Sequence, residues 1–236
     1  HSIDTIVLDK TGTITSGRPS VTDVLVLDAS LSRDDFLARA AAAEVGSEHP
    51  LAQAVVEHAR QKGLRMPVAT DFAATAGRGV RASVDGHIWH AGNPAYMEEV
   101  LRLSEQKEYS VLKEHTERLA SEGKTPLLLA GDGRITGIIA VADTIRDSSR
   151  EAIKAFREMG LHVVMLTGDN RLTASAIQRE LDIEETISDV LPTQKEACIR
   201  SLQEKGARVA MVGDGINDAP ALTRADIGIA IGAGTD

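Results

Sequence analysis

Short runs of apolar residues that end in polar loops occur at three places along the chain. The run Asp4–Asp9 leads into Lys-Thr-Gly-Thr, Val163–Leu166 leads into Thr-Gly-Asp-Asn, and Val209–Val212 leads into Gly-Asp-Gly-Ile-Asn-Asp. An unbroken apolar run of this length is typical of a strand that is buried on both faces. Helices are predicted between and after these strands, at residues 148–159, 172–181 and 193–204. Strands that alternate with helices favour an α/β domain with a Rossmann-type parallel sheet.

The middle of the chain has a different pattern. Two alanine-rich helices are predicted at 34–45 and 49–61, followed by three strands, a helix and a further strand at 69–74, 79–84, 87–91, 109–121 and 127–130. Antiparallel strands flanked by helices favour a separate α+β domain. This domain interrupts the first one, because the opening strand needs the later strands to complete its sheet. We therefore predict a discontinuous domain of residues 1–21 and 126–236 and an inserted domain of residues 22–125.

Composition excludes several classes of protein. A chain of 236 residues can hold two small domains with proper cores, and with 3% aromatic residues these cores must be aliphatic. The net charge of −9, without any stretch dense in Lys or Arg, argues against binding to nucleic acid. The single cysteine, Cys198, rules out an intramolecular disulfide and a cysteine metal cluster, and we interpret it as a structural thiol. No apolar run approaches the roughly 20 residues that span a bilayer.

The polar loops at the strand ends carry the candidate chemistry. Because the carboxyl ends of parallel strands share one edge of a sheet, the loops should bring together Asp9, Asp214, Asp218, Thr11, Thr167 and Gly168, with Lys195 from the 193–204 helix. Neighbouring carboxylates repel each other and need a cation, and Mg²⁺ is the ion that prefers such oxygens. Hydroxyls, backbone N–H groups and a lysine suit a phosphoryl group.

Asp9 is the candidate nucleophile for phosphoryl transfer through an aspartyl-phosphate. It ends its strand and is followed at once by a lysine and a hydroxyl-rich loop. The alternative is that the aspartates only cap turns and helices. That alternative is the better one for any single aspartate, but the whole set favours catalysis.

Four motifs then resemble a known family. Asp9–Thr13 resembles the phosphorylation motif of P-type ATPases, which are a branch of the haloacid-dehalogenase-like superfamily. The motifs at 167–170, 191–195 and 213–218 resemble the other phosphorylation-domain motifs of these ATPases and occur in the expected order. The resemblance implies that ATP phosphorylates Asp9 and that Mg²⁺ binds at Asp9 and Asp214, with Thr11 and Asp218 in the same site. It also implies that Thr167, Gly168 and Lys195 contact the phosphoryl group. It further suggests that Asp143 and Arg146 lie near this site.

The residue two positions after the nucleophile distinguishes a pump from a phosphatase. Phosphatases of this superfamily commonly have a second aspartate there, which acts as general acid and later as base. This chain has Thr11 instead. Without a carboxylate to activate water, we expect the aspartyl-phosphate to be long-lived, as a pump requires.

The predicted inserted domain resembles the nucleotide-binding domain of heavy-metal-transporting P-type ATPases. The matching segments are Ser47–Ala52 with Glu44 upstream, Gly77–Val80 and Gly92–Pro94. The resemblance implies that Glu44 and His49 help to hold adenine and that Gly77, Gly79, Gly92 and Asn93 belong to the nucleotide site, where glycines allow close approach of the backbone. Taken alone, His49-Pro50 is typical of a helix start and Gly77-x-Gly79 of a strand bend.

The combined prediction is the ATP-binding, autophosphorylating part of a heavy-metal P-type ATPase. The sequence Ser-Glu-His-Pro-Leu-Ala at 47–52 resembles copper pumps more than zinc, cadmium or lead pumps, so it favours a Cu(I) exporter. The alternatives are a soluble capped phosphatase and a nucleotide-sensing module without catalysis. As partners we expect ATP and ADP, and the actuator and membrane domains of a longer protein.

The place of this chain in such a protein follows from the resemblance. We expect a monomeric piece on the cytoplasmic face of a membrane that does not itself bind the transported ion. The chain stops at Gly234–Asp236, where the family usually continues through another helix and strand.

Overall fold

The computed structural model describes residues 2–231 except 106, 108 and 216. Ile216 of the third strand-end motif and the final residues Gly234–Asp236 therefore lie outside the described residues. The chain divides into two compact units, one formed by His1–Arg18 with Asp143–Asp236 and the other by Pro19–Ala142. We call them the discontinuous unit and the inserted unit.

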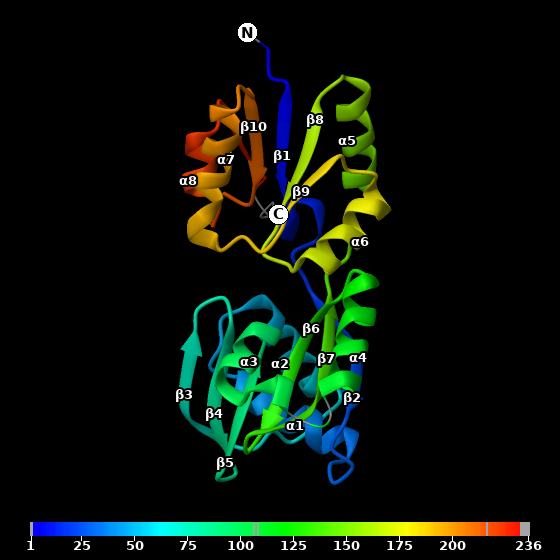
Figure 1. Cartoon of the computed structure of the whole chain (residues 1–236), viewed down its shortest axis with the longest axis vertical. Coiled ribbons are helices and arrows are strands. Elements are labelled where there is room, and N and C mark those ends of the chain that lie inside the picture. The colour runs from blue at the N-terminus through cyan, green and yellow to red at the C-terminus, as the bar shows by residue number, and fades with distance from the viewer. Residues whose placement is uncertain (1, 106, 108, 216, 232–236) are drawn as a thin grey trace. The chain divides into compact units, whose positions relative to one another are not determined.

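The discontinuous unit contains a parallel sheet of five strands in the order β11-β10-β1-β8-β9. The strands are β1 (Thr5–Asp9), β8 (His162–Leu166), β9 (Glu185–Ile187), β10 (Val209–Gly213) and β11 (Ile227–Ala230). The helices are α5 (Asp147–Glu158), α6 (Arg171–Leu181), α7 (Lys195–Glu204) and α8 (Ala219–Arg224). Figure 1 shows β1 in the middle of the sheet, between β8 and β10.

The helices of this unit cover both faces of the sheet. Ile6 and Leu8 of β1 pack with Ile153 of α5 and Ile177 of α6. Alternate residues of the same strands point the other way, and there they pack with residues of α7 and α8 that include Ile199, Leu202 and Ala221. Burial on both faces explains why these strands have unbroken apolar sequences.

The inserted unit contains an antiparallel sheet of six strands in the order β2-β7-β6-β5-β4-β3. The strands are β2 (Ser20–Val26), β3 (Ala69–Thr75), β4 (Gly79–Val84), β5 (His87–Gly92), β6 (Thr125–Gly131) and β7 (Arg134–Ala142). The helices are α1 (Arg33–Glu44), α2 (Pro50–Gln61), α3 (Pro94–Leu101) and α4 (Tyr109–Ser121). Helices α1 and α2 pack on one face of the sheet, and α3 and α4 pack on the other.

The fold class predicted from the sequence is confirmed: a parallel α/β sheet interrupted by an α+β insertion. The limits of the insertion differ from those predicted. The structure extends the inserted unit from residue 19 to residue 142, not from 22 to 125. The later limit moves because β6 and β7 pair with each other and with β5 and β2, and so complete the antiparallel sheet.

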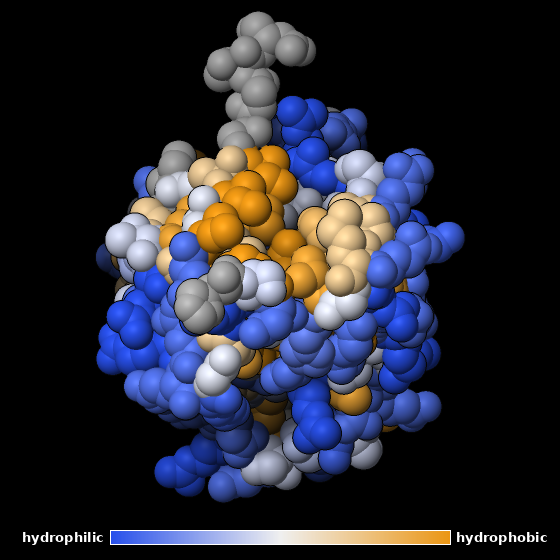
Figure 2. Space-filling view, turned by 90° about the horizontal axis from the view of Figure 1, so that it is seen from above, coloured by the Kyte–Doolittle hydropathy of each residue, from blue (hydrophilic) through white to orange (hydrophobic). Residues whose placement is uncertain are grey.

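The described part of the chain exposes several large apolar side chains. None of the helices in the described part of the chain has both the length and the apolar character needed to cross a membrane. Figure 2 shows apolar residues gathered in one area of a largely hydrophilic face. In the discontinuous unit, the exposed apolar side chains include Ile227 and Ile229 of the edge strand β11.

Candidate active site

The carboxyl ends of three neighbouring strands meet at one edge of the parallel sheet. In the register of the sheet, Asp9 of β1 lies opposite Leu166 of β8, and Leu8 lies opposite Val212 of β10. Asp9 is therefore next to the segments that carry Thr167 and Asp214, one residue beyond the end of β8 and of β10. The structure thus brings together the strand-end residues that the sequence singled out.

Lys195 joins two of the carboxylates. Its Nζ atom donates hydrogen bonds of 2.7 Å to Asp9 Oδ1 and of 2.7 Å to Asp218 Oδ1. Lys195 is the first residue of α7, and all three side chains are nearly or fully buried. Asp9 Oδ2 has no hydrogen bond among the described residues, so one carboxylate oxygen is fixed by the lysine and the other is available.

The site has more negative than positive charge. Burial raises the pKa of Asp9 to about 6; Lys195 opposes this rise, and the carboxylates of Asp218 and Asp214 add to it. Burial alone would lower the pKa of Lys195, but Asp9 and Asp218 raise it above its usual value. A further cation at this edge would relieve the repulsion between the carboxylates.

The carboxylate oxygens of the other two aspartates, Asp214 and Asp218, accept hydrogen bonds from different donors. Asp218 Oδ1 accepts from Lys195, and its Oδ2 accepts from the backbone N–H of Asp214 at 3.1 Å. Asn217 donates to Asp214 from its backbone N at 3.0 Å and from its side chain at 2.8 Å. Within the described residues, no three His, Cys, Asp or Glu side chains are grouped so that they could hold a metal ion by themselves.

The hydroxyl groups around Asp9 have different environments. Thr167 is 2% exposed, and its Oγ1 accepts a hydrogen bond of 3.1 Å from the backbone N of Asp169. The next residue, Gly168, packs closely against the backbone of Val190. A Cβ at Gly168 would lie 3.2 Å from Val190 O. Thr11 is exposed. Thr13, which was not among the predicted site residues, has a buried Oγ1 without a hydrogen-bond partner in the described part of the chain.

Lys10, Asp143 and Arg146 hold the loop after Asp9 and the segment that follows it, through contacts whose partners were not predicted. Lys10 pairs with Asp169 at 2.5 Å, across 159 positions of sequence. Asp143 accepts hydrogen bonds from the segment that follows the loop, from the hydroxyls of Thr15 and Ser16 and from the backbone N of residues 17 and 18. The guanidinium group of Arg146 donates to Thr15 O at 2.9 Å. Such contacts leave no local pattern in the sequence, and only the family resemblance hinted at Asp143 and Arg146.

In the inserted unit, Glu44 is a buried carboxylate at the end of α1. It is 4% exposed, and its carboxylate has no hydrogen-bond partner among the described residues. Burial raises its pKa to about 7. His49 lies just beyond, where its Nδ1 accepts from Leu51 N at 3.2 Å and so caps α2. His49 and Pro50 therefore form the start of α2, as is typical of a His-Pro pair.

The predicted nucleotide-site residues Gly79, Gly92 and Asn93 lie together around Tyr96. A Cβ at Gly79 would be 2.4 Å from the Tyr96 ring, and one at Gly92 would be 2.5 Å from it. Asn93 caps α3 by accepting from Tyr96 N at 2.8 Å, and the Tyr96 hydroxyl lies 2.9 Å from His90 Nδ1. These glycines are thus required by the packing of Tyr96. Gly77 instead takes a positive φ of 68° in the turn before β4.

Replacing Glu44 should change how stability depends on pH. Its pKa is about 7 in the folded chain and ordinarily 4.5, so the folded state binds more protons between these values and stability falls as pH rises through them. Glu44→Gln removes this loss, and we expect it to stabilise the chain at pH 8 by on the order of 3 kcal/mol. Urea unfolding at pH 4.5 and pH 8 measures the effect. The control is Glu48→Gln at an exposed position, and an equal gain for Glu44→Gln at both pH values would contradict the expectation.

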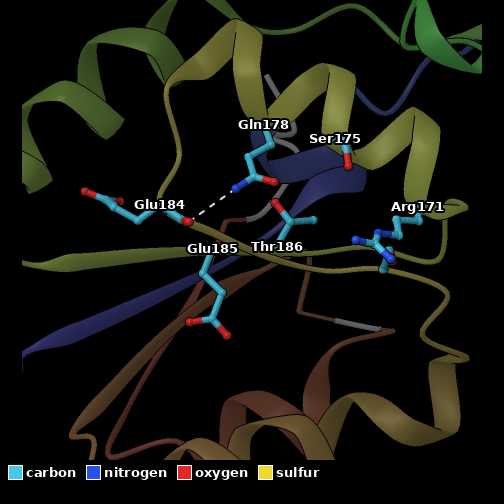
Figure 3. Close-up of a pocket in the computed structure, with 7 residues that line it drawn as sticks. Arg171, Ser175, Gln178, Glu184, Glu185 and Thr186 are labelled. Carbon is cyan, nitrogen blue, oxygen red and sulfur yellow. Dashed lines mark hydrogen bonds between the residues drawn. The ribbon is translucent and has the colours of Figure 1, made fainter.

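A pocket of about 330 Å³ lies apart from these residues, between α6 and β9. Figure 3 shows its polar lining, in which Gln178 donates to the backbone oxygen of Glu184. None of the residues singled out from the sequence lines it.

Comparison with known proteins assigns the family. The family model described as haloacid dehalogenase-like hydrolase matches residues 3–226, so the chain belongs to the haloacid dehalogenase-like hydrolase family. The chain is also 50% identical over its full length to the copper-exporting P-type ATPase of Bacillus subtilis (strain 168) and to that of Staphylococcus aureus (strain JH9). It covers 29% and 28% of the length of these curated relatives.

Solved structures agree with this assignment. A zinc-transporting PIB-type ATPase in the E2.Pi state is 37% identical with a TM-score of 0.65, and the match covers 99% of this chain and 37% of that one. The catalytic CPx-ATPase domain CopB-B is 29% identical with a TM-score of 0.71, and the match covers 100% and 80% of the two chains. The resemblance to the catalytic part of heavy-metal P-type ATPases is therefore confirmed.

Proposed function

We propose that this chain is the catalytic part of a copper-exporting P-type ATPase, and that Asp9 accepts the γ-phosphate of ATP. The observation that carries the proposal is the buried Asp9 carboxylate, which has Oδ1 held by Lys195 and Oδ2 without a hydrogen bond among the described residues. Identity of 50% to copper exporters over the whole chain supports the choice of copper.

The chemistry follows from the position of the two oxygens. Asp9 Oδ2 attacks the γ-phosphorus, the bond from this phosphorus to the bridging oxygen breaks, and ADP leaves with the electron pair. The ammonium group of Lys195 keeps Asp9 oriented and offsets negative charge near the phosphoryl group. Thr167 and Gly168, at the end of β8, and Thr11 supply further hydroxyl and backbone groups for the phosphoryl oxygens.

The same edge of the sheet fits Mg²⁺. Asp9 and Asp214 come from adjacent strand ends, and the charge of Asp214 contributes to the raised pKa of Asp9, as expected of carboxylates close enough to share a cation. Both oxygens of Asp218 already accept hydrogen bonds, so we assign it a supporting role. Thr11 is close to this site in sequence and offers its hydroxyl as a further ligand. When bound, Mg²⁺ would supply positive charge to the phosphate oxygens.

The lifetime of the phosphorylated aspartate depends on Thr11. A threonine hydroxyl cannot serve as the general base that a carboxylate provides, so water near Asp9 is not activated by this residue. A stable aspartyl-phosphate fits a pump, in which another part of the protein controls hydrolysis. We propose that this part is an actuator domain of a longer membrane protein, with the present chain on the cytoplasmic side and the copper site elsewhere.

The inserted unit is proposed to bind the adenine of ATP, with Glu44 as a principal contact. A buried carboxylate without a hydrogen bond is costly, and a ligand N–H group would satisfy it. His49, Gly77, Gly79, Gly92 and Asn93 are assigned to the same site by the resemblance.

Calorimetric titration of ATP into the chain tests this assignment. We expect Glu44→Ala to weaken binding about tenfold or more, because a hydrogen bond to a buried acid is lost. Asp9→Asn should bind ATP as tightly as the wild type, within about threefold, because it changes the phosphate acceptor and not the adenine site. Glu48→Ala is the matched control on an exposed neighbour. If the chain does not bind ATP, or if Glu44→Ala binds ATP as tightly as the wild type, the result would favour a capped phosphatase instead.

A further inference from the structure

One side of α6 is polar although it faces the strand β9. Arg171, Ser175 and Gln178 follow one another at intervals of four and three residues, so they share one side of the helix. The core contacts of α6 come from another side, which includes Ile177. Together with the segment 184–188, the polar side forms the pocket of about 330 Å³ (Figure 3). This volume lies at the lower end of the range of roughly 300–1,000 Å³ that is usual for small-molecule sites.

The two glutamates that line the pocket are engaged by partners of their own. Glu184 accepts a hydrogen bond of 3.0 Å from Arg157 Nε, and Glu185 Oε2 lies 2.9 Å from His162 Nε2. Figure 3 shows both carboxylates directed away from Arg171. The guanidinium group of Arg171 is therefore the charged group of the lining that is left without a partner among the described residues.

The remaining polar groups of the lining include two unused hydroxyls. Within the described residues, the side chain of Ser175 forms no hydrogen bond, and Thr186 of β9 has a buried Oγ1 without a partner. Gln178 Nε2 donates to two backbone oxygens in the turn before β9, so its Oε1 remains as an acceptor. A solvated helix face accounts for Ser175, but it does not account for a buried hydroxyl without a hydrogen bond, which costs free energy.

The unused groups match an anion with several oxygens. A guanidinium group binds two oxygens at once, which uses up a carboxylate, whereas a phosphate group has a further oxygen for the hydroxyls. We propose that this pocket binds the phosphate group of a small molecule, with Arg171 and Ser175 as its principal contacts and Thr186 as a third donor. None of the residues assigned to the Asp9 site lines the pocket, so the inference goes beyond the proposed function and does not depend on it.

Amide NMR titrations of the full chain test this inference. Glycerol phosphate, inorganic phosphate and glycerol are the three probes, and the signals of Ser175 and Thr186 report on the pocket. Both phosphates should shift these signals in a saturable way, and glycerol should not. Tighter binding of glycerol phosphate would identify an ester as the ligand, and equal binding would identify phosphate itself. If neither phosphate shifts these signals, the inference is wrong.

A pair of arginine variants shows whether the charge in the pocket is responsible. Arg171→Ala should weaken the binding of both phosphates by about tenfold or more, because a charged hydrogen bond is lost. Arg179→Ala is the matched control, since Arg179 is an exposed arginine of the same helix that does not line the pocket. Its affinity should stay within about twofold of the wild type. Equal affinities of the two variants would overturn the assignment of Arg171.

Thr186→Val separates a role in binding from a role in folding. Valine keeps the branched shape of the side chain and removes the hydroxyl. Because this hydroxyl has no hydrogen bond to lose in the described part of the chain, the Tm without ligand should not fall. Phosphate binding should weaken by about threefold or more, and the rise in Tm that phosphate causes should shrink accordingly. A lower Tm with unchanged affinity would mean that the hydroxyl is structural.

The outcomes also distinguish this inference from the proposed function. If phosphate shifts only the amide signals around Gly168 and Asp214, it binds at the Asp9 site alone, so the inference is wrong and the proposed function stands. If ATP does not bind but phosphate shifts the pocket signals in a way that depends on Arg171, the proposed function is wrong and the inference stands.

Discussion

Asp9→Asn should abolish the formation of phosphorylated protein from ATP, by a factor of about 10³ or more, because the amide has no nucleophilic carboxylate oxygen. The asparagine retains the shape of the side chain, and its amide oxygen can still accept from Lys195, so the fold of the site should survive. The measurement is incorporation of label from γ-labelled ATP with Mg²⁺ into acid-precipitated protein. The label should be released by hydroxylamine, as an acyl-phosphate requires.

Two controls make this result specific. Asp189→Asn changes an exposed aspartate of the same unit, at a positive φ of 57° that asparagine tolerates, and it should incorporate label like the wild type. The wild type should also hold its label for much longer than a phosphatase would, since Thr11 offers no base. Incorporation that persists in Asp9→Asn would assign the nucleophile elsewhere. Rapid loss of label, with turnover of small phosphate esters, would support a capped phosphatase.

The strands that carry this site could be predicted because their environment is uniform. β1, β8 and β10 are buried on both faces, so each has an unbroken apolar sequence that stops where the polar loop begins. Residue types then identified Asp9, Asp214 and Lys195 as candidates. The bond from Lys195 to Asp9 joins residues 186 positions apart, and its geometry depends on how α7 packs, which no local pattern records.

The limit of the inserted unit was harder to predict, and β7 shows why. Its sequence is interrupted by Gly137, and a glycine weakens the case for a strand. In the structure, a Cβ at Gly137 would lie 2.3 Å from Leu25 O and 2.8 Å from the Phe36 ring. The glycine is therefore required by close approach of β2 and α1 to the strand. The same kind of contact explains Gly79 and Gly92, whose close packing against Tyr96 could not be seen in the sequence.

Lys195→Ala should be the most destabilising single change in the active site. It removes the ammonium group from two buried carboxylates, those of Asp9 and Asp218. Breaking a buried ion pair by removing one partner costs about 3–5 kcal/mol. Phosphorylation from ATP should also fall, by roughly 10²–10³, because the acceptor loses its orientation and the phosphoryl group loses a positive charge.

The pH dependence identifies the cause of this destabilisation. Lys195 opposes the rise in the pKa of Asp9, so without the ammonium group this pKa climbs further above the ordinary value of 3.8, and the folded state holds a proton that the unfolded state has lost. Stability of the variant should then fall as pH rises from about 4, and its deficit relative to the wild type should be larger at pH 8 than at pH 4. Urea unfolding of both proteins at the two pH values measures the deficit, with Lys205→Ala at an exposed position as the control. A deficit of the same size at both values would mean that Lys195 stabilises the site through packing and not through its charge.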